Sequence, residues 1–211
     1  RMPGIGASAN AGLVQAVKRA AADRGRNYAD RCHLGYESAP QEDCAYGATS
    51  SARRVVLFGD SHAAQWFEPV DAAAKRAGWK FHAWTKTSCP SVDVTVWYKP
   101  RRAAYAECDE WRRAVTAALA GAQRPDLVLI SNHTDYGGWL QDRKTGDVLE
   151  RDEARRAWQA GLRETLARLT NAGVPVVLVR DTPRALKSVH ACLAKGGGSS
   201  CDRLRSQAVE E

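Results

Sequence analysis

The sequence predicts an α/β fold, a three-layer α/β/α sandwich built on a mainly parallel sheet. Short apolar runs such as VVLFG, at residues 55–59, are typical of strands that are buried on both faces. Segments with apolar residues at helical spacing alternate with these runs, and this alternation favours right-handed crossovers in a doubly wound sheet. At 211 residues, the chain is long enough to bury the core of one such domain.

The N-terminal part is predicted to be an appendage to this domain. Residues 1–12 are rich in Gly, Ala, Ser and Asn, a composition that is typical of a linker. A short amphipathic helix is predicted to follow around Leu13, and after it comes a polar stretch that contains two cysteines. We therefore predict a linker and a disulfide-bonded appendage over residues 1–52, and the main domain over residues 53–211.

The strands of the main domain are predicted from continuous apolar runs. The first run ends at Gly59, and the third follows Arg-Pro-Asp, a turn-forming sequence. The predicted strands cover residues 55–59, 79–85, 127–131 and 174–180.

The helices between these strands are predicted from apolar residues that recur on one face. A glycine stands where a C-terminal cap belongs after the first helix, at Gly78, and Gly173 follows the last one. The predicted helices cover residues 62–77, 107–120 and 152–171. Residues 87–105 are predicted to form a long loop, and the tail from His190 is interpreted as a disulfide-closed loop followed by the start of another helix.

Charge and hydropathy exclude two classes of protein. The formal net charge is +7, but the basic residues are spread through Ala/Arg-rich helices rather than gathered in one block, so we predict no nucleic-acid binding. The sequence contains no run of about 18 apolar residues of the kind that spans a membrane. It also begins without a signal-type apolar stretch, and any export signal or anchor is expected to lie outside it.

The cysteines indicate an oxidising compartment. Six cysteines allow 15 pairings in principle, and spacing alone does not choose among them. They fall into sequential pairs, none of the Cys-x-x-Cys form that is typical of zinc or redox sites. We interpret them as local disulfides in an extracytoplasmic protein, with free buried thiols in a cytosolic protein as the alternative. The predicted pairs are Cys32–Cys44, Cys89–Cys108 and Cys192–Cys201.

The candidate site lies beyond the carboxyl ends of the predicted strands, where open α/β sheets bind ligands. Ser61 follows the first strand directly, in the sequence Gly-Asp-Ser-His, and a serine in such a sharp turn can act as a nucleophile. Gly59 permits the tight turn, Asp60 is expected to hold it through side-chain hydrogen bonds, and His62 is expected to order it or to line the site. The alternative for Ser61 is an ordinary helix N-cap.

The segment VVLFGDSHAAQW resembles the first conserved block of the SGNH hydrolase superfamily. Its GDSHAxQW variant is similar to the SGNH domain that lies C-terminal to the acyltransferase-3 membrane domain of bacterial envelope O-acyltransferases. The spaced cysteines, Pro-Asp-Leu-Val-Leu-Ile from Pro125 and Asp-Thr-Pro from Asp181 agree with this resemblance, which spans about residues 30–205. It implies an SGNH, flavodoxin-like fold for the main domain.

The resemblance also implies the roles of single residues. Ser61 matches the nucleophile, and Asn132, after the third strand, matches the asparagine that helps to form the oxyanion hole, with a turn asparagine as the alternative. The family's Asp-x-x-His block has no counterpart after Asp181. We therefore expect the acid–base His and Asp to lie beyond Glu211, so that the main domain lacks this segment.

The function implied is O-acyl transfer, specifically O-acetyl transfer, to a cell-envelope glycan or glycolipid through a serine acyl-enzyme. The membrane partner, an acyltransferase-3 domain N-terminal in the same polypeptide, is expected to supply the acyl group and to tether the domain at the periplasmic or cell-wall side of the membrane. No cofactor and no metal site are predicted. The alternatives are an SGNH carbohydrate or lipid esterase and a non-catalytic glycan-binding module.

Four further residues are predicted to contact the substrate. His133 and Tyr136 follow the third strand, at the same rim as Ser61, and Trp139 comes shortly after them. Trp97 lies in the predicted loop before Cys108. Aromatic side chains at such places can stack on a sugar ring, although they also often cover the edge of a core.

Overall fold

The computed structural model describes residues 7–37, 40–183, 189–194, 201 and 208. The described chain forms two compact units. One comprises Gly25–Asp181, and the other combines the segments Arg1–Arg24 and Thr182–Glu211. In the second unit, α1 (Ala7–Ala22) packs with α7 (Val189–Ala194). Residues 7–12 are therefore helical, whereas the composition predicted a linker there.

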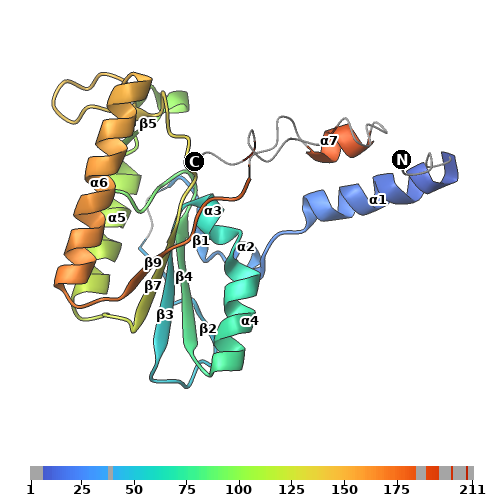
Figure 1. Ribbon diagram of the computed structural model, residues 1–211, viewed down its shortest axis with the longest axis horizontal. Coiled ribbons are helices and arrows are strands. Elements are labelled where there is room, and N and C mark those ends of the chain that lie inside the picture. The colour runs from blue at the N-terminus through green and yellow to red at the C-terminus, as the bar shows by residue number, and fades with distance from the viewer. Residues whose placement is uncertain (1–6, 38–39, 184–188, 195–200, 202–207, 209–211) are drawn as a thin grey trace. The chain divides into compact units, whose positions relative to one another are not determined.

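The larger unit is built on a mainly parallel sheet with the strand order β1-β4-β3-β7-β9 (Figure 1). The predicted α/β fold is confirmed. Strand β4 pairs in parallel with β3, β3 with β7, and β7 with β9. The strands of this path are β1 (His33–Leu34), β4 (Lys80–Lys86), β3 (Arg54–Gly59), β7 (Leu127–Ser131) and β9 (Val176–Leu178).

The segment before residue 53 belongs to this sheet. Strand β1 pairs in parallel with the end of β4, and β2 (Ala45–Gly47) pairs antiparallel with its beginning. The disulfide Cys32–Cys44 joins the two short strands, with α2 (Arg26–Ala29) directly before them. The compact units thus divide the chain differently from the predicted boundary at residue 52, because these strands hydrogen-bond to the central sheet.

Helices cover both faces of the sheet. Figure 1 shows α5 (Ala106–Ala120) and α6 (Arg151–Asn171) on one face and α4 (Phe67–Ala77) on the other. Alternate residues of β3 face the two layers: Val56 and Phe58 pack in the core under α5 and α6, whereas Val55 and Leu57 pack in the core under α4. This two-residue period explains why the whole run reads as apolar.

The predicted helix 62–77 is two helices, α3 (Ser61–Ala64) and α4. Pro69 occupies the third position of α4, where it has no N–H to donate to the carbonyl of Gln65 and its ring would clash with that carbonyl in a continuous helix. The chain therefore breaks at Gln65 and Trp66. Gly78 ends α4 in the left-handed conformation, as predicted, with φ +68°.

The predicted loop 87–105 contains regular structure of its own. Strand β5 (Thr95–Tyr98) pairs with β6 (Ala103–Ala104) and with β8 (Leu140–Gln141) in a small antiparallel sheet, and a 3₁₀ turn, η1 (Lys99–Arg101), joins β5 to β6. Trp97 therefore lies in a strand rather than in a loop. The predicted strand 174–180 is shorter in the structure, where β9 covers Val176–Leu178 at the edge of the sheet and leaves Val177 and Leu178 exposed.

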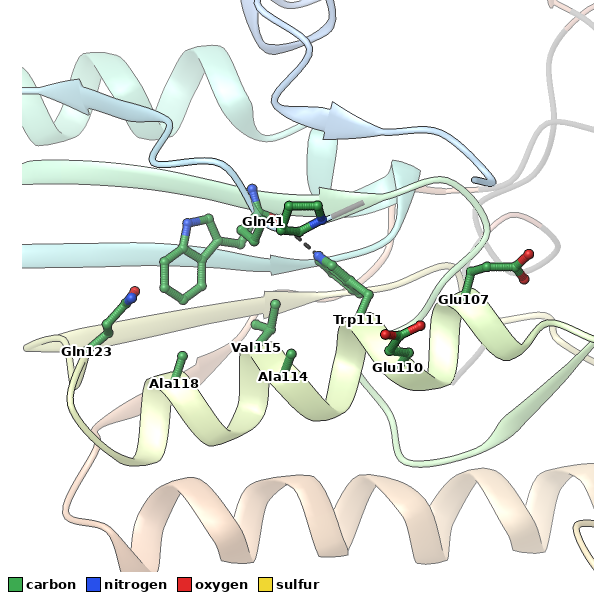
Figure 2. Close-up of a pocket in the computed structure, with 10 residues that line it drawn as sticks. Gln41, Glu107, Glu110, Trp111, Ala114, Val115, Ala118 and Gln123 are labelled. Carbon is green, nitrogen blue, oxygen red and sulfur yellow. Dashed lines mark hydrogen bonds between the residues drawn. The ribbon is translucent and has the colours of Figure 1, made fainter. Parts of the chain in front are cut away.

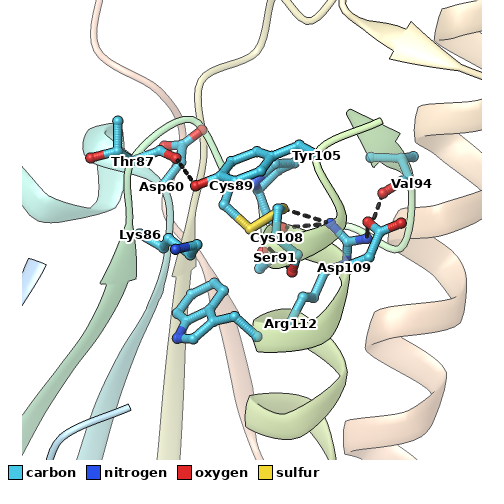
Figure 3. Close-up of a disulfide and its surroundings, with 12 residues drawn as sticks. Asp60, Lys86, Thr87, Cys89, Ser91, Val94, Tyr105, Cys108, Asp109 and Arg112 are labelled. Atoms are coloured by element: carbon cyan, nitrogen blue, oxygen red, sulfur yellow. Dashed lines mark hydrogen bonds and ion pairs between the residues drawn. A yellow bond between two sulfur atoms is a disulfide. The ribbon is translucent and has the colours of Figure 1, made fainter. Parts of the chain in front are cut away.

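The three predicted disulfides are confirmed. Cys89–Cys108 joins the loop after β4 to the first turn of α5, as Figure 3 shows. Beneath it, the buried guanidinium of Arg112 donates to Asp109 and to the carbonyl of Val94. Cys192–Cys201 closes a loop in the smaller unit. Cross-links over such short loops stabilise a fold by restricting the unfolded chain.

One buried histidine makes the stability of the sheet depend on pH. His82 of β4 is 3% exposed, and burial, with the positive charges of Arg54 and Lys80, lowers its pKa from 6.5 to about 4. In the unfolded chain His82 binds a proton below its ordinary pKa, whereas in the folded chain it stays neutral, so stability is lost as the pH falls from about 6.5 towards 4.

We therefore expect His82→Gln to flatten this part of the pH profile. The measurement is the free energy of unfolding in urea between pH 7 and 4, for the wild type and the variant. Carboxylates other than Asp43, whose Oδ1 lies 3.2 Å from Nδ1 of His82, titrate equally in both proteins, so the difference between the profiles reports His82 together with this contact. Parallel profiles would contradict the prediction.

Candidate functional site at the carboxyl rim of the sheet

Ser61 stands directly beyond the carboxyl end of β3. Gly59 ends the strand with φ +156°, and a side chain there would place its Cβ 1.9 Å from the carbonyl oxygen of Ser131. The ends of β3 and β7 therefore approach each other more closely than any residue other than glycine allows. Ser61 begins α3 and is partly exposed, so its hydroxyl lies at the rim.

The carboxylate of Asp60 joins this turn to the loop after β7. Asp60 is completely buried. One oxygen accepts the backbone N–H of His62 at 2.8 Å, and the other accepts the backbone N–H of His133 at 2.9 Å and the hydroxyl of Tyr136 at 2.7 Å. Burial raises the pKa of Asp60, and these hydrogen bonds oppose the rise because they stabilise the carboxylate. The predicted turn-holding role of Asp60 agrees with these contacts.

His62 forms a contact that the sequence did not suggest. Its Nδ1 lies 2.5 Å from Oδ1 of Asp181, which follows β9. The side chain of Asp181 is 4% exposed, and that of His62 is 24% exposed. The other oxygen of Asp181 accepts the backbone N–H of Thr134 at 3.1 Å. Loops after three different strands thus meet around one carboxylate and one imidazole.

Asn132 is held by Ser91, from the loop after β4. Its Oδ1 accepts the backbone N–H of Ser91 at 2.8 Å, and its Nδ2 donates to Oγ of Ser91 at 2.9 Å. The bond from the backbone N–H identifies the oxygen of the amide, so Nδ2 is the atom on the other side. Both side chains are buried, and Oδ1 of Asn132 lies near Gly59.

The residues predicted to contact the substrate differ in exposure: Tyr136 is buried, whereas Trp139 is exposed. Tyr136 is 6% exposed, stacks on Trp158 with ring centroids 5.1 Å apart and donates to Asp60, so it supports the turn from inside rather than offering a face to a sugar. His133 lies at the rim, with its ring 4.4 Å from that of His62. Trp139 is 42% exposed, and its carbonyl accepts the backbone N–H of Trp97.

A separate groove of about 420 Å³ runs along α5. Figure 2 shows Trp111, Val115 and Ala118 of this helix on one side, with Gln41 accepting the hydrogen bond of the Trp111 indole on the other. Ser61 and the side chains around it contribute nothing to its lining. The groove is therefore distinct from the rim site.

The described residues contain neither a candidate metal site nor a helix that could span a membrane. In residues 7–37, 40–183 and the short segments after them, no cluster of three or more His, Cys, Asp or Glu side chains could hold a metal ion. Within the same described part of the chain, no helix is long and apolar enough to cross a membrane.

The sequence placed Ser61, Asp60, His133 and Asn132 at one rim, and the structure brings them together. It did not indicate the contact of His62 with Asp181, because 119 residues separate the two positions. The only available signal was that both follow predicted strands, whose carboxyl ends meet at one edge.

The sequence-family model of SGNH domains that are fused to AT3 domains matches residues 31–211. Among solved structures, the periplasmic domain of a lipopolysaccharide acetyltransferase from Salmonella ser. Paratyphi A is similar, with a TM-score of 0.56 and 14% sequence identity. The match covers 91% of this chain and 66% of that one, and at this identity it shows a shared fold. No curated protein matches the sequence.

The close approach at Gly59 predicts a large effect of a single methyl group. We expect Gly59→Ala to destabilise the domain by about 3 kcal/mol, because the new Cβ would overlap the carbonyl oxygen of Ser131. Gly35→Ala is the matched control, since no atom lies within 4 Å of a Cβ placed there. Urea denaturation measures both. Equal stabilities of the two variants would show that the ends of β3 and β7 are not packed as described.

The hydroxyl of Tyr136 is predicted to stabilise the ionised Asp60. Removing it in Tyr136→Phe is expected to cost about 1.5–3 kcal/mol of stability, the usual range for a hydrogen bond to a charged group. Tyr98→Phe serves as the control, because Tyr98 also stacks on an aromatic ring, that of Tyr36, but lies at the partly exposed surface. Thermal or urea unfolding at pH 7 measures the difference. A loss no larger than that of the control would contradict this role.

Proposed function

The chain belongs to the family of SGNH domains that are fused to AT3 domains, and from this membership we propose that it is a serine-dependent acyltransferase domain with Ser61 as its nucleophile. More specifically, we propose that the transferred acyl group is an acetyl group. The acceptor is a hydroxyl group of a cell-envelope glycan or glycolipid.

The observation that carries the proposal is the way in which the turn at Ser61 is built. A serine hydroxyl is a weak nucleophile, so an enzyme must expose it in a fixed position and surround it with groups that handle protons and negative charge. The turn is locked by Gly59 on one side and by the three hydrogen bonds to Asp60 on the other. Asp60, rather than Ser61, is the N-cap of α3, so the alternative in which Ser61 only caps that helix does not apply.

Asn132 and the backbone N–H of Ser61 are the donors that we propose for the oxyanion. One hydrogen of Asn132 Nδ2 is used by Ser91, and an amide nitrogen has a second one. The buried contacts with Ser91 fix the plane of the Asn132 amide, so that this second hydrogen has a defined direction. Preorganised donors of this kind typically contribute about 100- to 1000-fold to the rate.

The proposed reaction has two halves. In the first, Oγ of Ser61 attacks the carbonyl carbon of the acyl donor, the donor's leaving group departs, and an acid–base group transfers the serine proton to it. In the second, the acceptor hydroxyl attacks the acyl-Ser61 ester, the bond to Oγ breaks, and the hydroxyl proton returns to Oγ through the same group. The acid–base His and Asp that the family implies stay a prediction for chain beyond Glu211.

The acceptor is proposed to be a sugar because of the exposed aromatic surface near the rim loops. Trp139 offers an exposed ring, Trp97 is bonded to its backbone, and the amino group of Lys99 lies 5.3 Å from the centroid of the Trp139 ring. Lys99 lies over one face of this indole, and the other face suits a sugar ring, whose C–H surface can stack on it. His133 is proposed to contact the same substrate from the loop after β7.

The location and the partner follow from the family. SGNH domains of this family are fused to AT3 domains, and we propose that such a membrane domain, N-terminal in the same polypeptide, supplies the acyl group and tethers the site outside the cytoplasmic membrane. Three disulfides are typical of an oxidising compartment. The similar solved structure is itself a periplasmic domain. No cofactor is needed in this scheme.

A serine-directed fluorophosphonate tests the proposal. We expect the intact mass of the full-length protein to rise by one adduct, and Ser61→Ala to remain unmodified. The same experiment separates two alternatives: an esterase would also be labelled, whereas a glycan-binding module without an activated serine would not. Absence of the adduct in the wild type would overturn the catalytic proposal.

A further inference from the structure

The contact between Asp181 and His62 determines which nitrogen of the imidazole carries a proton. Oδ1 of Asp181 lies 2.5 Å from Nδ1 and can only accept when ionised, so the hydrogen is on Nδ1. With the hydrogen on Nδ1, the lone pair of the imidazole is on Nε2. The backbone N–H of His62 donates to Asp60, so the main chain of this residue is held as well. The tautomer and the orientation of His62 are thus both specified by carboxylates.

The ring is directed along the rim rather than at Ser61. Consecutive residues of a helix leave its axis about 100° apart, so the side chains of Ser61 and His62 diverge. That of His62 turns towards the loops after β7 and β9, where it meets the ring of His133 and the carboxylate of Asp181. It is still 24% exposed, whereas Asp181 beneath it is nearly buried. His62 therefore forms part of the surface next to the nucleophile.

The lone pair on Nε2 of His62 can accept a hydrogen bond from a hydroxyl group that binds next to Ser61. The acceptor in an acyl transfer must bring its O–H beside the acyl-serine with a lone pair of the oxygen turned towards the carbonyl carbon. A nitrogen that accepts the hydrogen bond of this O–H holds it in that orientation. Water can be held in the same way, but a sugar hydroxyl is carried by a larger molecule that contacts the rim at other points too.

We propose that His62, positioned by Asp181, binds the hydroxyl group of the acyl acceptor through Nε2. This inference rests on the proposed acyl transfer at Ser61 and gives a specific role to a residue that the sequence placed either in the turn or in the lining of the site. Asp181 acts through His62 and is a positioning residue. The two residues affect the acceptor half of the reaction and leave the acylation of Ser61 unchanged.

The test separates the two halves of the reaction in the full-length protein. The fluorophosphonate reports the reactivity of Ser61 alone. With p-nitrophenyl acetate as donor and the methyl glycosides of glucose, galactose and rhamnose as acceptor probes, mass spectrometry measures the acetylated glycoside relative to free acetate. Ser61→Ala defines the background for both readings.

Asp181→Asn is the decisive variant. An amide N–H at this position donates to Nδ1, so the ring carries its hydrogen on Nε2 and can no longer accept there. We expect the rate at which the acetylated glycoside forms to fall about tenfold or more, with the labelling rate of Ser61 within about twofold of the wild type. His62→Phe, which keeps a ring against His133, is expected to give the same result. Asp126→Asn is the matched control, because it makes the same substitution at a residue directly before β7, away from His62.

Three outcomes would overturn the inference. Labelling and transfer that fall together would make the pair part of the acylation machinery. Unchanged values in both variants would make it a purely structural contact, and a labelled wild type that acetylates none of the probes would show that the rim does not bind a sugar hydroxyl. A wild type that is not labelled at all is a different result, because it removes the proposed function itself.

Discussion

The buried carboxylate of Asp60 is the constraint on which the rim depends. It accepts hydrogen bonds from the first turn of α3, from the backbone after β7 and from the hydroxyl of Tyr136. A buried carboxylate is unfavourable unless several donors compensate for its lost hydration, so these groups cannot separate without a large cost. Two loops that are far apart in sequence are thereby held in one fixed arrangement, with Ser61 on one of them and Asn132 on the other.

The surrounding elements extend this arrangement outwards. The disulfide Cys89–Cys108 holds the loop that carries Ser91 against α5, and Ser91 in turn orients Asn132. On the other side, Asp181 reaches from β9 to the imidazole of His62. Every strand end of the parallel sheet from β4 to β9 thus contributes to one surface, which is the general reason why open α/β sheets place their sites at this edge.

The sequence predicted those features that have a local signal. Apolar runs identified β3, β4 and β7, and the motif after β3 identified the nucleophile. It missed features that depend on partners elsewhere in the chain: β1 and β2 are too short to be recognised before they pair with β4. The residues of β5 read as a loop because one partner, β6, has only two residues and the other, β8, lies far along the chain, with Val96 paired to Leu140. The pair of His62 and Asp181 was missed for the same reason, since neither residue has a neighbour in sequence that reveals the other.

The central claim is that this rim is a preorganised site for acyl chemistry at Ser61. A crystal structure of the fluorophosphonate-treated protein tests it most directly, because the phosphoryl oxygen of the adduct occupies the position of the oxyanion. The account predicts that oxygen within about 2.7–3.1 Å of both the backbone nitrogen of Ser61 and Nδ2 of Asn132. An adduct whose oxygen points to solvent, with Asn132 still bound only to Ser91, would contradict it.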